Sequence, residues 1–116
     1  MGNRQRGDYF ERQCRDALAA HGWLIVRSAG SLGVADLVAL RGGHRPLLIS
    51  CKLSGRIDPG ERLELISAAW LAGARALVAM RSKPGYVELR AVHEKPGRGT
   101  PVDVLKVPPR RKAEPL

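Results

Sequence analysis

The chain has 116 residues, with 20 Lys and Arg against 11 Asp and Glu and a formal net charge of +9. This length favours one domain with one modest core, and the 44% of hydrophobic residues excludes a chain that is disordered throughout. No apolar run approaches the roughly 18 residues of a membrane span and no signal-peptide pattern opens the chain, so we expect a cytoplasmic protein. The surplus of positive charge favours a polyanionic partner, nucleic acid first.

The two cysteines, Cys14 and Cys51, lie in segments with periodic apolar residues and show no CxxC spacing. A disulfide framework is therefore not expected, and a reducing cytoplasm is the simplest location. The histidines His21, His44 and His93 add no workable ligand spacing, so we reject zinc binding.

Residues 8–21 carry apolar side chains at helical spacing and predict the first helix. Asp8 is a suitable N-cap, and Glu11 three residues later completes a capping-box pattern. Gly22 ends this helix. Residues 1–7 are expected to form a flexible basic N-terminus.

Three strands are expected next, over residues 23–26, 35–41 and 46–53, with a loop at 27–33 and a tight Gly42-Gly43 turn. The third strand alternates in character, which predicts two distinct faces. One face carries Leu47, Ile49, Cys51 and Leu53, and the other carries Leu48, Ser50, Lys52 and Ser54.

Asp58 as N-cap and Pro59 at the first helical position predict a second helix that runs to residue 72 and is closed by Gly73. Its buried side is expected to carry Leu63, Ile66, Ala69 and Trp70. Strands follow over 75–81 and 86–92, and residues 102–105 are a candidate short edge strand. We therefore predict one α/β domain over 8–95, a mixed central sheet flanked by helices, and a Pro/Lys/Arg-rich segment over 96–116 with a mobile end.

Three residues in these predicted elements are candidate catalytic residues. Glu11 lies at the border of the apolar face of the first helix, roughly 60° from its middle, although the capping box explains it equally. Asp36 opens an apolar strand, where acids are depleted, unless it is a turn aspartate. Lys52 lies in an apolar strand. Burying a lysine there costs free energy unless the lysine is paired or the strand is an edge strand with one face exposed to solvent.

Together, an acid on the first helix, an acid opening the second strand and a lysine on the third resemble the PD-(D/E)xK nuclease superfamily. The resemblance implies a restriction-endonuclease-like α-β-β-β-α-β core. Three segments make the resemblance more specific, because they look like the corresponding segments of archaeal-type Holliday junction resolvases. They are Phe-Glu-Arg at 10–12, Val-Arg-Ser-Ala-Gly-Ser at 26–31 and Ala-Asp-Leu-Val-Ala at 35–39. The match covers about residues 6 to 81.

This resemblance implies a homodimeric endonuclease of DNA recombination and repair, which nicks two opposed strands of a four-way junction. Glu11, Asp36 and Lys52 would be the catalytic residues. The cofactor would be Mg²⁺, or Mn²⁺, held by Asp36, the Cys51 carbonyl and, through water, Glu11. The implied DNA-binding residues are Arg12, Arg27, Ser28 and Ser31.

The chain departs from the family at Ser50, where the family has an acid two residues before the lysine. A neutral hydroxyl is a weak Mg²⁺ ligand, so we expect slow or absent cleavage that Ser50→Glu would restore. A natural variant with shifted ligands and an introduced inactivating change both remain open. Glu61 and Glu64 are the only nearby acids that could substitute, and their helical context indicates capping or solvent exposure.

Two other functions compete with a junction-resolving enzyme. Ser50 favours a catalytically silent, structure-specific DNA-binding protein that keeps the nuclease fold, and the basic charge also suits a small RNA-binding protein. The aromatic content of 4% argues against a base-stacking surface, so contacts should be to the nucleic-acid backbone. For a dimer interface, the candidates are Trp70, Leu71 and residues 77–80.

Overall fold

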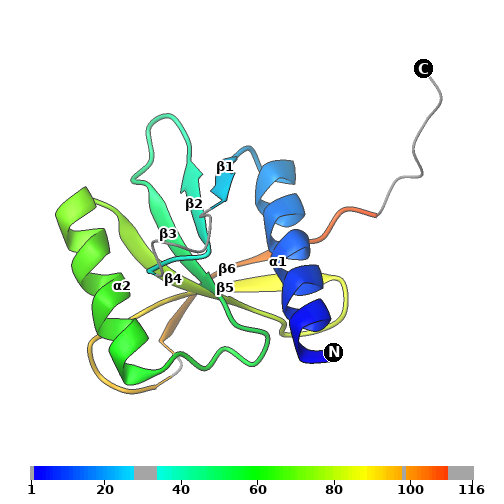
Figure 1. Ribbon diagram of the computed structural model, residues 1–116. Helices are drawn as coiled ribbons and strands as arrows, with labels where there is room; N and C mark the ends of the chain where they lie inside the picture. Colours follow the sequence, from blue (N-terminus) through cyan, green and yellow to red (C-terminus); the bar gives the residue numbers. More distant parts are fainter. Residues whose placement is uncertain (1, 28–33, 98, 110–116) are drawn as a thin grey trace.

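The computed structural model describes residues 2–27, 34–97 and 99–109. Two helices and six strands follow one another along the chain (Figure 1). Their order is α1 (Gly2–Ala20), β1 (Leu24–Arg27), β2 (Leu37–Leu40), β3 (Leu47–Cys51), α2 (Pro59–Ala72), β4 (Arg75–Met80), β5 (Tyr86–Ala91) and β6 (Thr100–Lys106). Within these ranges no helix is both long and apolar enough to cross a membrane.

The six strands form one mixed sheet in the order β1-β2-β3-β4-β5-β6. All neighbours are antiparallel except β3 and β4, which are parallel and are connected by α2. A parallel pair needs such a crossover, because a tight turn can only reverse the chain. This arrangement confirms the predicted α/β domain with a mixed central sheet. It also confirms the predicted order of elements along the chain: a helix, three strands, a helix and a strand.

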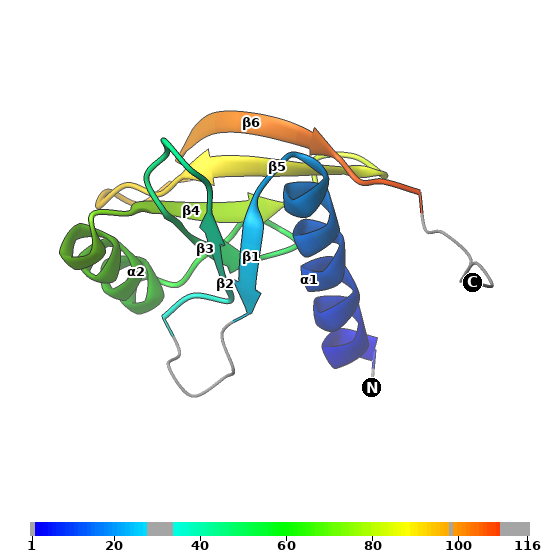
Figure 2. The same cartoon turned by 90° about the horizontal axis from the view of Figure 1, so that it is seen from above.

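The sheet lies between the two helices, and each helix buries apolar side chains against it (Figures 1 and 2). The face toward α1 forms the main core, in which Phe10, Cys14 and Leu18 are at most 1% exposed. Because side chains alternate along a strand, Leu77 and Ala79 of β4 point into this core, and Val78 points to the opposite face of the sheet, which α2 covers. Residues 77–79 are therefore buried inside the subunit, and the predicted contribution of this strand to a dimer interface is wrong.

The second helix has the predicted bounds. Asp58 precedes it, Pro59 is at its start, and Gly73 ends it with a φ of 64° while its backbone N–H donates to the carbonyls of Ala69 and Trp70. This left-handed φ favours glycine, so the local sequence determines where the helix stops.

The predicted buried face of α2 is correct at Ala69 and wrong at Leu63 and Trp70. The helix buries Arg62, Leu65 and Ala69, whereas Leu63 is 55% and Trp70 is 81% exposed. Apolar residues occur around most of this helix, so their spacing does not define one face. The buried Arg62 is accommodated because its guanidinium donates to the carbonyl of Ile57.

Two further boundaries differ from the prediction. Helix α1 begins at Gly2, so Asp8 lies inside it and the predicted capping box with Glu11 does not form. The Arg and Gln residues before Asp8 are good helix formers, which explains the longer helix. Strand β6 pairs with β5 along residues 100–106, so the sheet extends beyond the predicted limit at residue 95.

Candidate active site

Asp36 precedes β2 and contacts the end of β3. Its backbone N–H donates to the Ile49 carbonyl over 2.9 Å, which extends the pairing of the two strands. Its carboxylate oxygen Oδ2 accepts the backbone N–H of Cys51 at 2.7 Å. Asp36 is therefore fixed beside the Cys51-Lys52 segment and is not a free turn residue.

Glu11 extends from α1 toward the end of β1. Its side chain is 15% exposed, and its Oε2 lies 3.5 Å from the guanidinium of Arg27 at the end of β1. Arg27 remains 59% exposed, so its outer donors can reach a ligand in solvent. Glu11 is thus ion-paired with Arg27 and is not part of a capping box, and its role in the site stays a prediction.

Lys52 follows β3 directly instead of lying at the centre of a strand, and its backbone N–H donates to the Ala79 carbonyl. Its Nζ lies 2.9 Å from Oε2 and 3.2 Å from Oε1 of Glu61, in the first turn of α2. The expectation that Glu61 only caps the helix or faces solvent is wrong. The sequence does place an acid at the start of the helix that follows the lysine. Spacing along the chain alone, however, does not show that the two side chains are in contact.

The thiol of Cys51 lies among these groups. Its hydrogen bond with the thiol of Cys14 raises its pKa, as do burial and the negative charges of Cys14, Asp36 and Glu11. A thiol held in its neutral form is a poor nucleophile and a poor metal ligand, which leaves the backbone carbonyl as the donor at Cys51.

Ser50 is buried, with 4% of its surface exposed. It pairs with Val78 of β4, and the alternation along β3 puts its side chain on the face opposite to Ile49 and Cys51. This position offers no carboxylate, as the sequence shows.

The predicted donors for a divalent cation are the oxygens of Asp36, Glu11 and the Cys51 carbonyl, of which Asp36 is fixed beside Cys51. Asp36, Glu11 and the Cys51 carbonyl are hard oxygen ligands of the kind that Mg²⁺ prefers, and Mg²⁺ retains several waters. Among the described residues, no three side chains of the Asp, Glu, His or Cys type come together as a metal-holding group. Low affinity is the expected result of this donor set.

Of the remaining predicted DNA-binding residues, the structure describes Arg12. Arg12 lines a groove between α1 and the segment that follows β6, together with Tyr9 and Pro108, and is not part of the cluster around Asp36. Ser28 and Ser31 lie outside the described residues. Their roles, like that of Arg12, stay predictions.

A mixed sheet between two helices, with an acid before β2, a lysine after β3 and an acid on the first helix, is the arrangement expected of PD-(D/E)xK nuclease folds. A family model described as archaeal Holliday junction resolvase (Hjc) matches residues 2–96. The chain belongs to this family. Nuclease resolvases of this kind are generally metal-dependent.

Two relatives show how far the similarity extends. Crossover junction endodeoxyribonuclease Hjc of Methanocaldococcus jannaschii is 35% identical over an alignment of 81 residues, which covers 66% of this chain and 59% of that protein. The solved structure of Archaeoglobus fulgidus Hjc, a Holliday junction resolvase from an archaeal hyperthermophile, is 27% identical with a TM-score of 0.64. That comparison covers 75% of this chain and 73% of the other.

Proposed function

We propose that the protein is an endonuclease that uses a divalent cation, Mg²⁺ in the first place, to nick the strands of four-way DNA junctions. The observation that carries this proposal is the 2.7 Å hydrogen bond from the Cys51 backbone N–H to Asp36, which fixes an acid beside the residue that precedes Lys52. Family membership and the positive net charge of +9 support it. No separate reason favours RNA over DNA.

Hydrolysis of a phosphodiester needs an oriented water and neutralised charge on the phosphate. Asp36 and the Cys51 carbonyl would hold the cation, with Glu11 acting through water; bound there, the cation polarises a phosphoryl oxygen and lowers the pKa of water. Lys52 would orient the attacking water and offset negative charge on the phosphate. Arg27 suits phosphate binding because a guanidinium can donate two parallel hydrogen bonds.

A cleavage assay combined with a binding assay separates the two leading functions. The full chain is incubated with a labelled four-way junction and with a linear duplex of the same sequence, with Mg²⁺ or with EDTA. Nicks in the junction that require Mg²⁺ support the enzyme. Tight junction binding without any nick would support the catalytically silent DNA-binding protein, and preferential displacement by duplex RNA would overturn both.

We expect Arg27→Ala to weaken junction binding because it removes an exposed guanidinium next to the site. Loss of one phosphate contact should lower the slope of log K against log salt by about one. Titrations at several salt concentrations measure both quantities. Lys106→Ala, which removes an exposed cation from β6 at the opposite edge of the sheet, is the control. An Arg27 variant that behaves like this control would exclude the contact.

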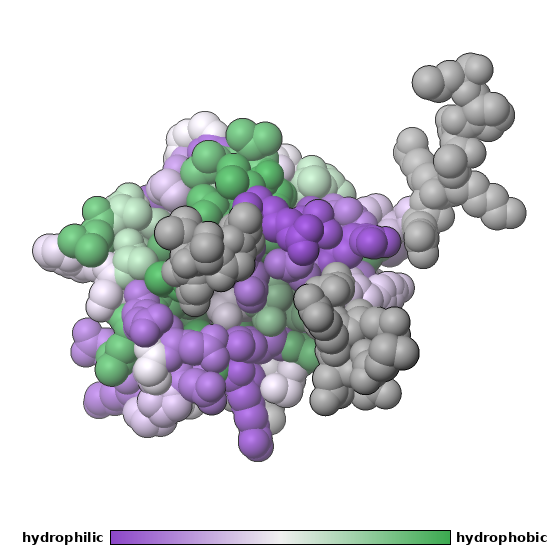
Figure 3. Space-filling view, in the orientation of Figure 1, coloured by the Kyte–Doolittle hydropathy of each residue, from purple (hydrophilic) through white to green (hydrophobic). Residues whose placement is uncertain are grey.

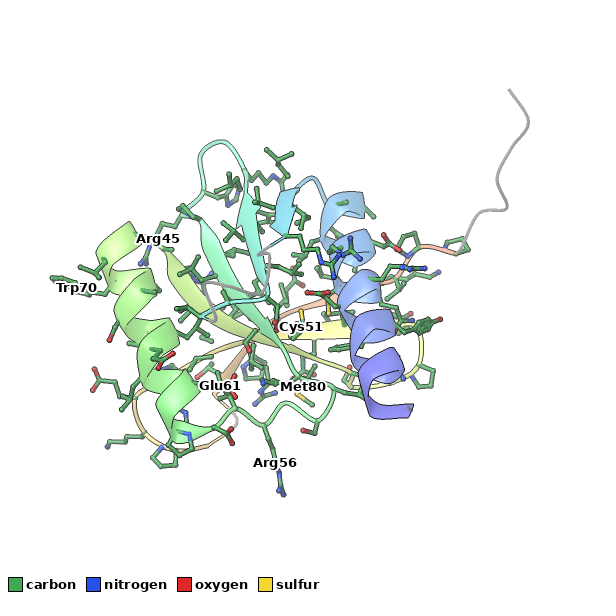
Figure 4. All side chains as sticks on the ribbon, in the orientation of Figure 1. Arg45, Cys51, Arg56, Glu61, Trp70 and Met80 are labelled. Carbon is green, nitrogen blue, oxygen red and sulfur yellow. The ribbon has the colours of Figure 1, made fainter. Side chains whose placement is uncertain are left out.

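We also propose a two-fold homodimer, which would set two sites at a fixed separation for two symmetry-related strands. Support comes from unpartnered apolar side chains on α2, where Trp70 is 81% and Leu71 is 80% exposed. Hydrophobic surface is visible over α2 in Figure 3, and Trp70 points away from the body of the protein in Figure 4.

We expect the double variant Trp70→Glu/Leu71→Glu to be monomeric, because two buried charges without partners would oppose association. Sedimentation equilibrium at micromolar concentration measures this. Val104→Glu on β6, at a position 47% exposed, is the control for adding charge to an apolar surface. A monomeric unmodified chain, or a dimer that only Val104→Glu disrupts, would contradict an α2 interface.

A further inference from the structure

A cavity of about 480 Å³ lies at the opposite end of β3 from the candidate active site. It is lined by Leu47 and Arg75, which pair with each other at the starts of β3 and β4, whereas Asp36 contacts Cys51 at the end of β3. Four residue steps separate Leu47 from Cys51, which corresponds to roughly 13 Å along the strand. Sites for small ligands typically have volumes of about 300 to 1,000 Å³. The cavity is therefore large enough for a small ligand and is separate from the candidate active site.

Apolar side chains form the inner wall of this cavity. Trp23, in the turn between α1 and β1, is half-buried there, and its ring lies edge-on to that of His44 with 5.4 Å between the ring centroids. Proteins that bind nucleobases hold the planar base between aromatic and apolar side chains, so this wall suits a base. The sheet contributes one leucine from each of four neighbouring strands, and all four are at most 4% exposed: Leu47, Leu77, Leu89 and Leu105.

Three arginines, Arg41, Arg45 and Arg75, surround the same cavity. Backbone carbonyls hold two of them in place. The guanidinium of Arg41 donates to the His21 carbonyl at 3.0 Å, and that of Arg45 donates to two carbonyls directly after α2, at 3.3 and 2.9 Å. Figure 4 shows Arg45 beside this end of α2. These side chains are ordered before a ligand arrives, which lowers the entropic cost of binding.

Acids do not balance the charge of these three arginines. In the part of the chain that the structure describes, none of them forms an ion pair, and the guanidinium of Arg75 makes no hydrogen bond. Among the described lining residues the only acid is Asp103, whose carboxylate accepts the N–H of Val104. Three cations against one anion leave the cavity with a net positive charge. A guanidinium can donate two parallel hydrogen bonds to a phosphate, so phosphate is the anion that this cavity suits.

We propose that the cavity binds a nucleoside monophosphate, with the phosphate on the arginines and the base beside Trp23 and the leucine wall. Free nucleotides and the terminal nucleotide of a DNA strand share this chemistry. One aromatic ring serves one base, so the site does not need the extended stacking surface that an aromatic content of 4% argues against. The proposal goes beyond the proposed function, because it concerns the other end of β3 and requires no divalent cation.

Calorimetric titration of the full chain with three probes tests this site: deoxyadenosine monophosphate, deoxyadenosine and inorganic phosphate. The monophosphate should bind saturably and more tightly than the other two, because each of those lacks one half of the ligand. Its binding should quench tryptophan fluorescence, also in the Trp70→Phe chain, in which Trp23 is the only tryptophan.

Competition distinguishes the two sources of the ligand. A single DNA strand with a terminal phosphate and the same strand without it are each titrated against bound deoxyadenosine monophosphate. If the site takes the end of a strand, the phosphorylated strand displaces the monophosphate at a lower concentration than the other strand does. If the site takes the free nucleotide, neither strand displaces it.

Arg75→Ala should weaken monophosphate binding about tenfold or more, because it removes hydrogen bonds to a charged group. Asp103→Asn should strengthen binding, because it removes the acid that repels the phosphate. Arg56→Ala is the matched control: it removes an exposed arginine that points away from the body of the protein in Figure 4, and should leave binding unchanged. Thermal unfolding of each variant verifies that the fold is retained.

The inference is overturned if the monophosphate does not bind saturably, if phosphate or deoxyadenosine binds as tightly as the monophosphate, or if the Arg75→Ala chain binds as the Arg56→Ala chain does. The assays contain neither a junction nor a divalent cation, so they do not depend on nicking. Nucleotide binding that depends on Arg75 in a chain that never nicks junctions would support this site and refute only the proposed function.

Discussion

The Asp36→Asn variant is expected to bind four-way junctions and to lose about 10³-fold of the nicking rate, since one charged group that acts in the transition state contributes about 4 kcal/mol. The substitution keeps the shape of the side chain and removes its charge. An asparagine oxygen can still accept the backbone N–H of Cys51, so the hydrogen bond at 2.7 Å in the structure need not be lost. The change therefore tests chemistry with little effect on folding.

Single-turnover nicking of a labelled junction and the thermal unfolding midpoint are the two measurements for this variant. Asp36→Ala is the comparison, because it leaves the N–H of Cys51 without its partner and should cost about 1–3 kcal/mol of stability. Full nicking activity in a folded Asp36→Asn chain would show that Asp36 is not part of the active site.

Lys52→Met is expected to reduce nicking by about 10²- to 10³-fold, as removal of a single group that stabilises developing charge does in other sites. Methionine retains the unbranched stem and lacks the ammonium. Junction affinity should change little, because the loss of one cation removes only a small part of a net charge of +9.

The control for Lys52 is Lys106→Met, which removes an exposed lysine on β6. Rates are compared at saturating protein, so that binding does not limit them. If Lys52→Met and Lys106→Met nick equally fast, the ammonium of Lys52 has no catalytic role, and its ion pair with Glu61 is structural.

Much of the fold was predictable because local signals mark the ends of its elements. The bounds of α2 follow from Asp58 and Pro59 at its start and from Gly73 at its end, which adopts a left-handed conformation that glycine permits. The alternation along β3 correctly separated the core-facing Ile49 from Ser50 on the other face.

The errors arise where local patterns are ambiguous. Apolar residues around most of α2 do not define its buried face, and tertiary packing selects Leu65 over Leu63. Strand β6 was underestimated because it includes Pro101, which is tolerated there since β6 is an edge strand.

The candidate site was predictable only in part. Glu11, Asp36 and Lys52 were singled out by their positions and by the resemblance, and the hydrogen bond from the Cys51 N–H fixes Asp36 beside the end of β3. The approach of Glu61 to Lys52 depends on the path of the turn at Gly55. No periodicity in the sequence encodes that path, so the contact appears only in three dimensions.

The central claim is that this chain cuts junctions with a cation held at the end of β3. Its most direct test is the single-turnover cleavage of a four-way junction by the full chain, with strand-resolved products, as Mg²⁺ is titrated. We predict paired nicks in two opposed strands whose rate rises with Mg²⁺ and disappears in EDTA. Saturated junction binding with no nick at any Mg²⁺ or Mn²⁺ concentration would contradict the claim.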